Sequence, residues 1–353
     1  MSQLSVNAIT DAAGGNTATI NGMTPTADSL QGFRNRILNG GMVLDQRNAG
    51  ASVTINSNQY TIDRYQAIQT QTGKYSVQQS TTAPTGFKNS MLITSASAYS
   101  VLSSDEFYFR QSIEGYNVAD LAFGTASAAT VTLSFLVRSS LTGTFGGALK
   151  NDAGNRAYPF SYTISAANTW EQKSITIAGD TTGTWDTGNS RGLQVIFGLG
   201  VGSTYSGTAG SWAAANYSSA TGAVSVVGTS GATFYITGVQ LEAGSVATPF
   251  ERRPYGTELA LCQRYFENAS ANGSFSGGYI SAAALSVYSM AFFKVTKRAS
   301  PTMTTTTCQT QASGGAVTNR TFGTSALNAE GFSASLAGSD PVAYIVWAAS
   351  AEL

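Results

Sequence analysis

The 353-residue chain contains no histidine, only two cysteines and few charged side chains, 11% of the total. Without histidine, the chain cannot build a Ser–His–Asp catalytic triad. Cys262 and Cys308 form no Cys-x-x-Cys spacing, which argues against a disulfide scaffold and a zinc site. Lys+Arg and Asp+Glu are 19 each, and this balance argues against nucleic acid or an anionic membrane surface as the partner.

Long apolar runs are also absent. No stretch approaches the roughly 18 uncharged apolar residues of a membrane helix, so we expect no membrane insertion. The first residues, MSQLSVNAIT, have neither a basic start nor an apolar segment. The sequence therefore predicts synthesis in the cytoplasm without a Sec signal peptide.

The sequence does contain segments in which apolar and polar residues alternate. In VTLSFLVRS, the apolar residues Val131, Leu133, Phe135 and Val137 share one face, and FYFRQSIEG, QKSITIAG and LQVIFGLGV repeat the pattern. Gly, Asn and Asp clusters separate these runs, and no helical pattern lies between them. Several half-buried strands over roughly 200 residues predict an all-β fold, a jelly-roll β-sandwich.

The pattern changes after the strand-like FYITGVQLE. Pro249 and Pro254 break regular structure, and Thr257 is the expected N-cap of a short helix in ELALCQRYFEN. Four further strand-like runs follow, which predict a second, smaller β domain. The predicted organisation has four parts: an extended N-terminal arm at 1–32, the jelly roll at 33–252, a linker with a short helix at 253–268, and the small β domain at 269–353. The small polar residues of the first part fit either a flexible tail or an arm that becomes ordered against a partner.

Catalytic motifs are weak. GNSRG matches the Gly-x-Ser-x-Gly pattern but lacks a histidine and a strand–turn–helix setting, and GLGVG lacks the third glycine and the helix of a dinucleotide site. The carboxylates show no spacing typical of a glycosidase. We therefore expect no catalytic residues, no cofactor and no metal. Asp180 and Asp186 form a weak candidate calcium site, since their segment has few acids.

Aromatic residues outside the alternation suggest binding. Trp185 lies in a Gly/Thr loop, and Tyr205, Trp212 and Tyr217 lie in a long polar loop. Sugars are held by aromatic faces together with hydrogen-bonding groups, and the loops at one end of a sandwich commonly carry binding sites. These four residues are the predicted glycan-binding residues. Alternatively, they fix a long loop or pack against a neighbouring subunit.

Four stretches carry a resemblance to a known group of proteins. They are LSVNAITDAAGG near the N-terminus, NRILNGGMVLDQRNAG with the nearby YTIDRYQ, the long FYITGVQLEAGSVATPFERRPYGTELALCQRYFE, and the terminal WAASAEL. Together they resemble a module of tail-fibre-like and other virion structural proteins of tailed bacteriophages. The middle of the chain, about 80–230, matches only in its strand rhythm.

This resemblance implies a non-enzymatic virion component. It implies a homotrimer with a carbohydrate-binding-module-like jelly roll, attached to other virion proteins through the N-terminal arm. It also implies that one cluster fixes the two β domains against each other or against neighbouring protomers. The residues of that predicted contact are Glu251, Arg252, Arg253, Leu259, Tyr265 and Phe266.

Three functions follow as hypotheses. The first is a tail-fibre-like protein that adsorbs to a host-surface glycan. The second is a structural decoration, cement or adaptor protein of the virion. The third, a tailspike depolymerase, would require two carboxylates across a groove, roughly 5–10 Å apart.

Overall fold

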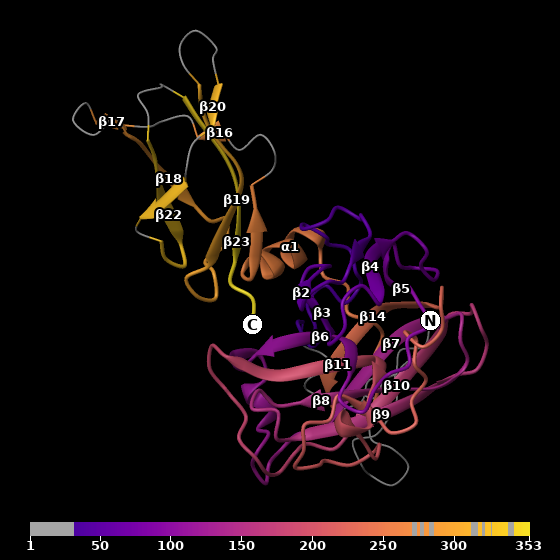
Figure 1. The fold of residues 1–353 in the computed structure, drawn as a ribbon. Helices are drawn as coiled ribbons and strands as arrows, with labels where there is room; N and C mark the ends of the chain where they lie inside the picture. Colours follow the sequence, from indigo (N-terminus) through magenta and orange to yellow (C-terminus); the bar gives the residue numbers. More distant parts are fainter. Residues whose placement is uncertain are drawn as a thin grey trace, which may run out of the picture.

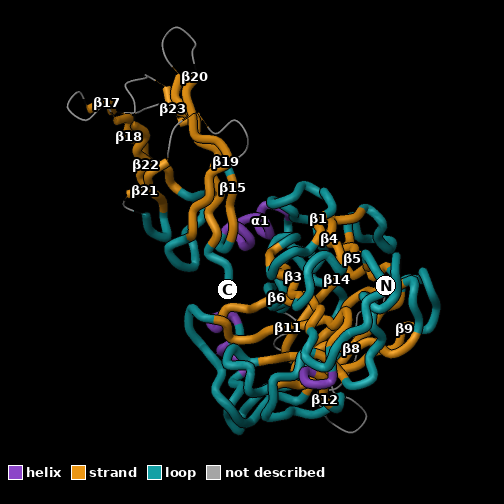
Figure 2. Tube along the Cα trace, in the orientation of Figure 1, coloured by secondary structure: helices purple, strands orange, loops and turns teal. Residues whose placement is uncertain are grey.

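The computed structural model describes residues 32–269, 274–275, 279–281, 286–311, 317–319, 322–325, 327–337 and 342–353. Apart from its last residue, the predicted arm at 1–32 lies outside this part. The chain forms two β domains of unequal size, connected by one short α-helix, α1 (Figure 1). Strands and loops make up almost all of it (Figure 2). The predicted all-β class is confirmed, as is the order of jelly-roll sandwich, short helix and small β domain.

The large domain consists of two six-stranded antiparallel sheets. The first has the order β1 (Val53–Thr54), β4 (Tyr75–Ser80), β5 (Ser90–Ser95), β14 (Thr233–Ala243), β7 (Val131–Ser139) and β10 (Glu171–Ile177). The second has the order β2 (Gln59–Tyr60), β3 (Tyr65–Gln69), β6 (Glu106–Glu114), β11 (Arg191–Val201), β8 (Gly143–Lys150) and β9 (Ala157–Ile164). Short elements decorate the loops: η1 (Gly115–Asn117), η2 (Ala119–Leu121), η3 (Ser203–Tyr205) and the parallel pair β12 (Ser206–Gly207) and β13 (Ser219–Ala220).

Aromatic side chains join the two sheets of the large domain. Phe109 on β6 stacks on Phe197 of β11, with ring centroids 5.1 Å apart. From the opposite sheet, Phe135 meets Phe197 edge-on at 5.1 Å and Phe234 approaches Phe109 at 6.0 Å. Burying a side chain of this size stabilises a fold by roughly 1.5–3 kcal/mol. The alternation read from the sequence therefore places its apolar face in the core, as predicted.

The small domain is built from two further sheets. One contains β15 (Phe266–Asn268), β23 (Val342–Ser350), β19 (Thr302–Gln311), β20 (Val317–Asn319) and β16 (Ser274–Phe275). The other contains β17 (Tyr279–Ser281), β18 (Ser286–Phe292), β22 (Gly331–Ala337) and β21 (Phe322–Ser325). Its core includes Phe293 and Trp347, whose ring centroids are 5.6 Å apart.

Helix α1 (Tyr255–Gln263) begins earlier than predicted. Pro254 occupies the N-cap position, no side chain caps the helix, and the Glu258 N–H donates to the Pro254 carbonyl at 3.0 Å. The predicted cap at Thr257 is wrong, because proline already suits the start of a helix and places Thr257 inside the first turn. No helix in the described part of the chain is long and apolar enough to cross a membrane.

Candidate functional site

Two of the predicted glycan-binding residues meet at one end of the large sandwich. Trp185 and Trp212 pack edge-to-face with centroids 5.4 Å apart, and Phe123 and Tyr158 complete what we call the end cluster. The Trp212 indole N–H donates to the Ala178 carbonyl at 2.7 Å, and that of Trp185 to the Thr182 carbonyl at 3.2 Å. Both indoles thus hold the loops to the core, although their role in sugar binding stays a prediction.

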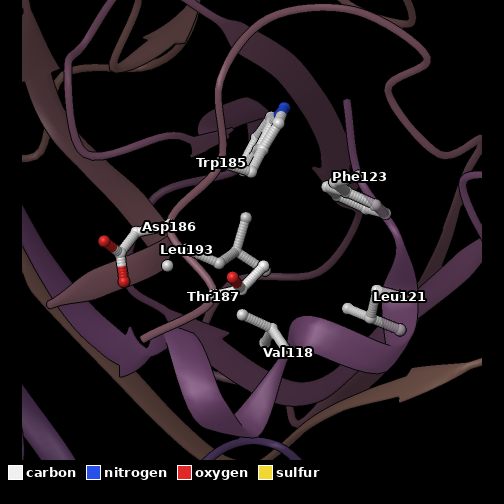
Figure 3. Close-up of a pocket in the computed structure, with 8 residues that line it drawn as sticks. Val118, Leu121, Phe123, Trp185, Asp186, Thr187 and Leu193 are labelled. Carbon is white, nitrogen blue, oxygen red and sulfur yellow. The ribbon is translucent and has the colours of Figure 1, made fainter. Parts of the chain in front are cut away.

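The cavity beside the end cluster is small. Its lining includes Val118, Leu121, Phe123, Trp185 and Asp186 (Figure 3), and it encloses about 10 Å³. This volume is close to the minimum for a single water molecule. A sugar ring has no room in this cavity.

Tyr205 and Tyr217 lie in a different loop, around β12 and β13. The Ser218 N–H donates to the Tyr205 carbonyl at 2.8 Å. The Tyr217 ring covers Gly207, where a Cβ would stand 2.3 Å from Tyr217 Cδ2. No ring contact joins either tyrosine to the end cluster within residues 32–269, so the four predicted residues do not form one surface.

The weak calcium candidate is not supported. Arg156 pairs with Asp180 through two hydrogen bonds of 2.6 and 2.7 Å, and Asp186 Oδ1 accepts the Gly188 N–H at 2.8 Å. Burial alone would raise the pKa of Asp180, but the hydrogen bonds and charge of Arg156 help to lower it below the usual range. The Asp180 charge is thus already compensated. No group of three or more His, Cys, Asp or Glu in the described residues is arranged to hold a metal.

The predicted contact cluster divides into two parts. Tyr265 and Phe266 lie at the junction, by which we mean the contacts between the two β domains. Tyr265 donates to Glu114 at 2.7 Å, and the Arg64 guanidinium lies 3.5 Å from the Tyr265 ring centroid. Arg47 covers the Phe266 ring at 3.6 Å. Both aromatic residues are therefore interdomain contacts.

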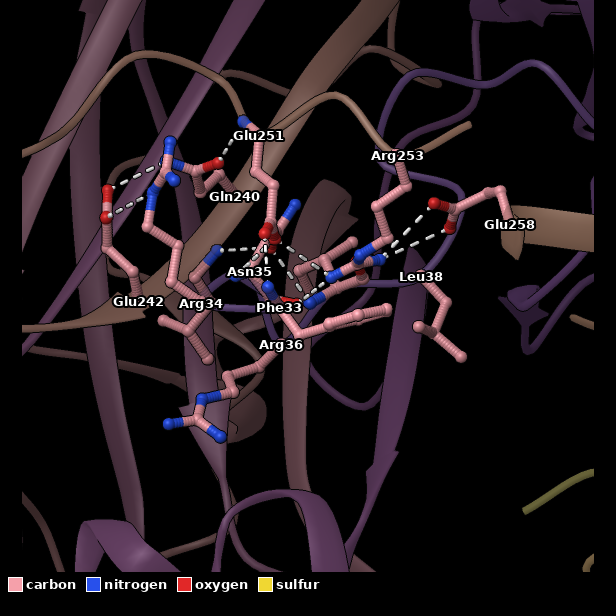
Figure 4. Close-up of polar contacts among 12 residues, drawn as sticks. Phe33, Arg34, Asn35, Arg36, Leu38, Gln240, Glu242, Glu251, Arg253 and Glu258 are labelled. Atoms are coloured by element: carbon pink, nitrogen blue, oxygen red, sulfur yellow. Dashed lines mark hydrogen bonds and ion pairs between the residues drawn. The ribbon is translucent and has the colours of Figure 1, made fainter. Parts of the chain in front are cut away.

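The charged part of the cluster does something else. Glu251 accepts the backbone N–H groups of Phe33 and Asn35, and Arg253 donates to the Asn35 and Ile37 carbonyls (Figure 4). Arg253 also pairs with Glu258 of α1 at 3.3 Å. These side chains fasten the first described segment of the large domain to β14 and α1.

The Arg252 guanidinium packs within the large domain as well. Arg252 lies 4.6 Å from the Phe87 ring centroid, within the large domain. Leu259 is half-buried on α1. In the described residues, no hydrogen bond, ion pair or cation–π contact joins Glu251, Arg252 or Arg253 to the small domain, and their contact with neighbouring protomers stays a prediction. The reason is that this part of the chain packs against the first described segment of the large domain before it enters α1.

A larger cavity lies beside the junction, and we call it the junction pocket. It encloses about 320 Å³, within the range of small-molecule sites, which starts near 300 Å³. Three segments far apart in the sequence form it: the first described residues, the end of β6 with η1, and α1 with the residues after it. Its lining includes Phe33, Arg36, Glu114, Tyr116, Asn117, Arg253, Leu261, Arg264 and Tyr265.

Two lining aromatic residues are largely exposed, Phe33 by 58% and Tyr116 by 64%. Phe33 has a φ of 64°, a left-handed conformation that is rare for a bulky residue, and Glu251 holds its N–H. Tyr116 belongs to η1, where its N–H donates to the Gly188 carbonyl at 2.8 Å. The preceding residue must be glycine, because a Cβ on Gly115 would lie 2.5 Å from Asp186 Oδ1. Both rings are thus held at the pocket by fixed backbone.

The carboxylate in the pocket wall is firmly held. Glu114 accepts hydrogen bonds from Arg264 at 2.6 and 3.0 Å and from the Tyr265 hydroxyl at 2.7 Å. Burial alone would raise the pKa of Glu114, but these hydrogen bonds and the Arg264 charge outweigh it and lower the pKa. Burial raises the pKa of Tyr265. Glu114 is therefore an ionised acceptor rather than a proton donor.

Two buried donors of lining residues have no partner among the described residues. The Nε atoms of Arg36 and Arg253 are buried and have no hydrogen-bond partner in the described part of the chain. The Arg253 side chain is only 6% exposed. A buried donor without an acceptor is costly, and such groups call for an explanation. Because both atoms have almost no accessible surface, a ligand in the pocket does not reach them.

Four residues that line the pocket were not predicted from the sequence as site residues, namely Phe33, Arg36, Tyr116 and Asn117. Arg36 lies in the NRILNGGMVLDQRNAG stretch, and Phe33 lies two residues before it. No local pattern marks them, because they converge only in the folded chain. The turn after β6 is the one signal that could have directed attention to Tyr116.

Comparison with known proteins gives structural likeness only. No protein-family model matches the chain, and no curated protein matches its sequence. Among solved structures, a bacteriophage CBA120 tailspike protein 4 domain is 12% identical, with a TM-score of 0.32, over 60% of this chain and 22% of that one.

Two further structures are similar at the same level. A putative sugar-binding protein from Bacteroides thetaiotaomicron is 14% identical, with a TM-score of 0.36, over 60% of this chain and all of its own length. A family 11 carbohydrate-binding module from Clostridium thermocellum is 13% identical, with a TM-score of 0.29, over 57% of this chain and all of its own. Likenesses this distant concern the fold and do not bear on function.

Proposed function

We propose that this chain is a non-enzymatic virion protein of a tailed bacteriophage that binds a host-surface glycan in the junction pocket. The observation that carries the binding part is that two exposed rings, Phe33 and Tyr116, line one cavity together with Arg264, whose side chain is 33% exposed. A sugar presents a C–H face to an aromatic ring and hydroxyl oxygens to a donor. The virion part rests on the sequence resemblance described above.

Three further features belong to this proposal. The protein acts as a homotrimer on the particle, and residues 1–32 attach it to other virion proteins. Weak binding at each pocket is then multiplied by several copies. It does not cleave its ligand, since Glu114 is committed to Arg264 and Tyr265 and is a poor general acid.

The binding test compares matched aromatic variants of the full chain. Immobilised bacterial surface polysaccharides are screened, and the monovalent affinity for the best one is measured by calorimetry. Phe33→Ala and Tyr116→Ala should each weaken binding about fivefold, since an aromatic contact is worth about 1 kcal/mol. Tyr255→Ala is the control, because Tyr255 is 62% exposed but lies outside the pocket lining.

A different result would favour the end cluster as the glycan site. If Trp212→Ala abolished binding while Tyr116→Ala had no effect, the junction pocket would not be the glycan site. Incubation with the bound polysaccharide should release no new reducing ends, and their release would contradict the non-enzymatic proposal.

A second candidate function is a structural component of the virion. The same exposed Phe33 favours it, because this side chain directly follows the predicted arm and could contact another subunit. Cryo-electron microscopy of the intact particle separates the two functions. Projecting trimers with open pockets fit adsorption, whereas copies lying flat with Phe33 and Tyr116 covered fit a decoration or cement protein.

A further inference from the structure

The small domain binds the backbone at the end of α1, where two residues of the junction pocket lie. Carbonyl groups at and just beyond the end of a helix have no partner within the helix. Here the Arg298 N–H donates to the Arg264 carbonyl at 3.0 Å, and the Ala351 N–H donates to the Tyr265 carbonyl at 2.7 Å. Arg264 and Tyr265 both line the pocket. One wall of the pocket is therefore attached to the small domain through its backbone.

Arg298 also binds the loop of the large domain that fixes Tyr116. The Arg298 Nη1 donates to the Asn189 carbonyl at 2.8 Å, and the Asn189 side-chain amide donates back to the Arg298 carbonyl at 2.6 Å. Gly188, the residue before Asn189, accepts the Tyr116 N–H at 2.8 Å. Arg298 is thus connected to one lining residue, Arg264, directly and to another, Tyr116, through two loop residues.

The Arg298 side chain is itself held firmly. Its Nε donates to the Ala351 carbonyl at 2.9 Å, and its Nη2 donates to the Glu352 carbonyl at 3.2 Å. Together with the bond to Asn189, all three guanidinium nitrogens donate to backbone carbonyls. A planar guanidinium fixes the directions of its hydrogen bonds, whereas an ammonium group on a flexible stem does not. Arg298 therefore connects the residues after β23 rigidly to the large domain.

We propose that Arg298 is a positioning residue of the junction pocket, through which the small domain holds Tyr116 and Arg264 in place for glycan binding. Its effect on glycan affinity rests on the function proposed above. The small domain thereby contributes to binding without touching the glycan, since the lining found in the described part of the chain ends at Tyr265.

The first measurement needs no glycan. Amide hydrogen exchange of the Tyr116 N–H is followed by NMR in the full chain. Arg298→Ala removes the three side-chain bonds, so exchange at Tyr116 should become about fivefold faster. Arg298→Lys keeps the charge but loses the planar fork, and it should speed exchange in the same direction. Lys294→Ala, which removes an exposed cation of the small domain, is the control and should leave this rate unchanged.

The second measurement is the affinity for the bacterial surface polysaccharide that binds best in the screen described above. Arg298→Ala should weaken it about fivefold, although Arg298 lies outside the pocket lining. In a double-mutant cycle with Tyr116→Ala, the two losses should not add, because Arg298 acts partly through the placement of that ring. A residue that only stabilised the fold would lower the melting temperature without changing the affinity of the folded chain.

The positioning role and the glycan site can fail separately. Unchanged exchange at Tyr116 in both Arg298→Ala and Arg298→Lys would overturn the positioning role, whatever the affinity. Faster exchange without a loss of affinity would overturn it as well if Tyr116→Ala still weakens binding. If Tyr116→Ala also leaves binding unchanged, the junction pocket is not the glycan site. Fully additive losses in the cycle would show that Arg298 does not act through Tyr116, and they would contradict the proposal.

Discussion

The core of the large domain and the junction both bury large side chains, but different interactions hold them. The core joins its sheets through apolar and aromatic side chains such as Phe109, Phe135 and Phe197. The junction is charged: Arg64 pairs with Glu352, Arg47 pairs with Glu352 at 3.0 Å, and Arg298 donates to the Asn189 carbonyl at 2.8 Å.

Because of this difference, the core and the junction contribute differently to the stability of the fold and to the orientation of the two domains. Burial of apolar side chains stabilises the fold strongly but does not fix their relative orientation, because the hydrophobic effect is non-directional. Buried ion pairs add less net stability, since desolvation offsets their attraction, but they require a defined geometry. The core therefore stabilises the sandwich, while the junction sets how the small domain is held against it.

The largest expected effect is in the core. Phe109→Ala removes a ring that is stacked at 5.1 Å on Phe197 and almost fully buried. We expect the free energy of unfolding of the large domain to fall by about 4 kcal/mol, from lost transfer energy and the cavity left behind. Urea denaturation followed by circular dichroism measures it. A loss below about 1 kcal/mol would show that the core is not organised around these rings.

A smaller effect is expected from breaking a junction pair. Arg64→Met leaves the Glu352 carboxylate buried with only Arg47, and stability should fall by about 3 kcal/mol. Arg64→Met/Glu352→Gln should recover part of the loss, since the unpaired charge is gone. Small-angle X-ray scattering should show the single variant with a broader range of domain orientations. An unaltered scattering profile would mean that the ion pair does not orient the domains.

The smallest effect is a change in pH dependence. The lowered pKa of Glu114 means that its stabilising contribution is complete above the unfolded carboxyl pKa, about 4.3, and is lost as pH falls through the lower folded pKa. Glu114→Gln should therefore be less stable than the parent chain at pH 7, with the difference shrinking towards pH 3. Melting temperatures across this range measure it, with Asp152→Asn as an exposed control. A constant difference at all pH values would contradict the assignment.

Much of the fold could be predicted from local pattern. The alternation in β6, β7, β11 and β14 depends only on which side chains are apolar, and a strand places every second one on the same face. The helix was predicted from its breaks and composition, but its start was misplaced at Thr257, because Pro254 was interpreted as a break and not as the residue at which the helix starts. Of the four predicted glycan-binding residues, Trp185 and Trp212 contact each other in the end cluster. Tyr205 and Tyr217 lie elsewhere.

By itself, the sequence determined that this protein is a β-sandwich with a short helix and a second β domain, because strand periodicity is a local property. Only the tertiary structure decided what the charged residues do. Glu114, Arg253 and Phe33 line one pocket, although they come from segments more than 70 residues apart in the sequence. The hydrogen bond from the Leu38 N–H to the Gln111 side chain, for example, joins residues that are 73 positions apart. Partner choice among arginines and carboxylates depends on distance and burial, and neither is encoded in a local pattern.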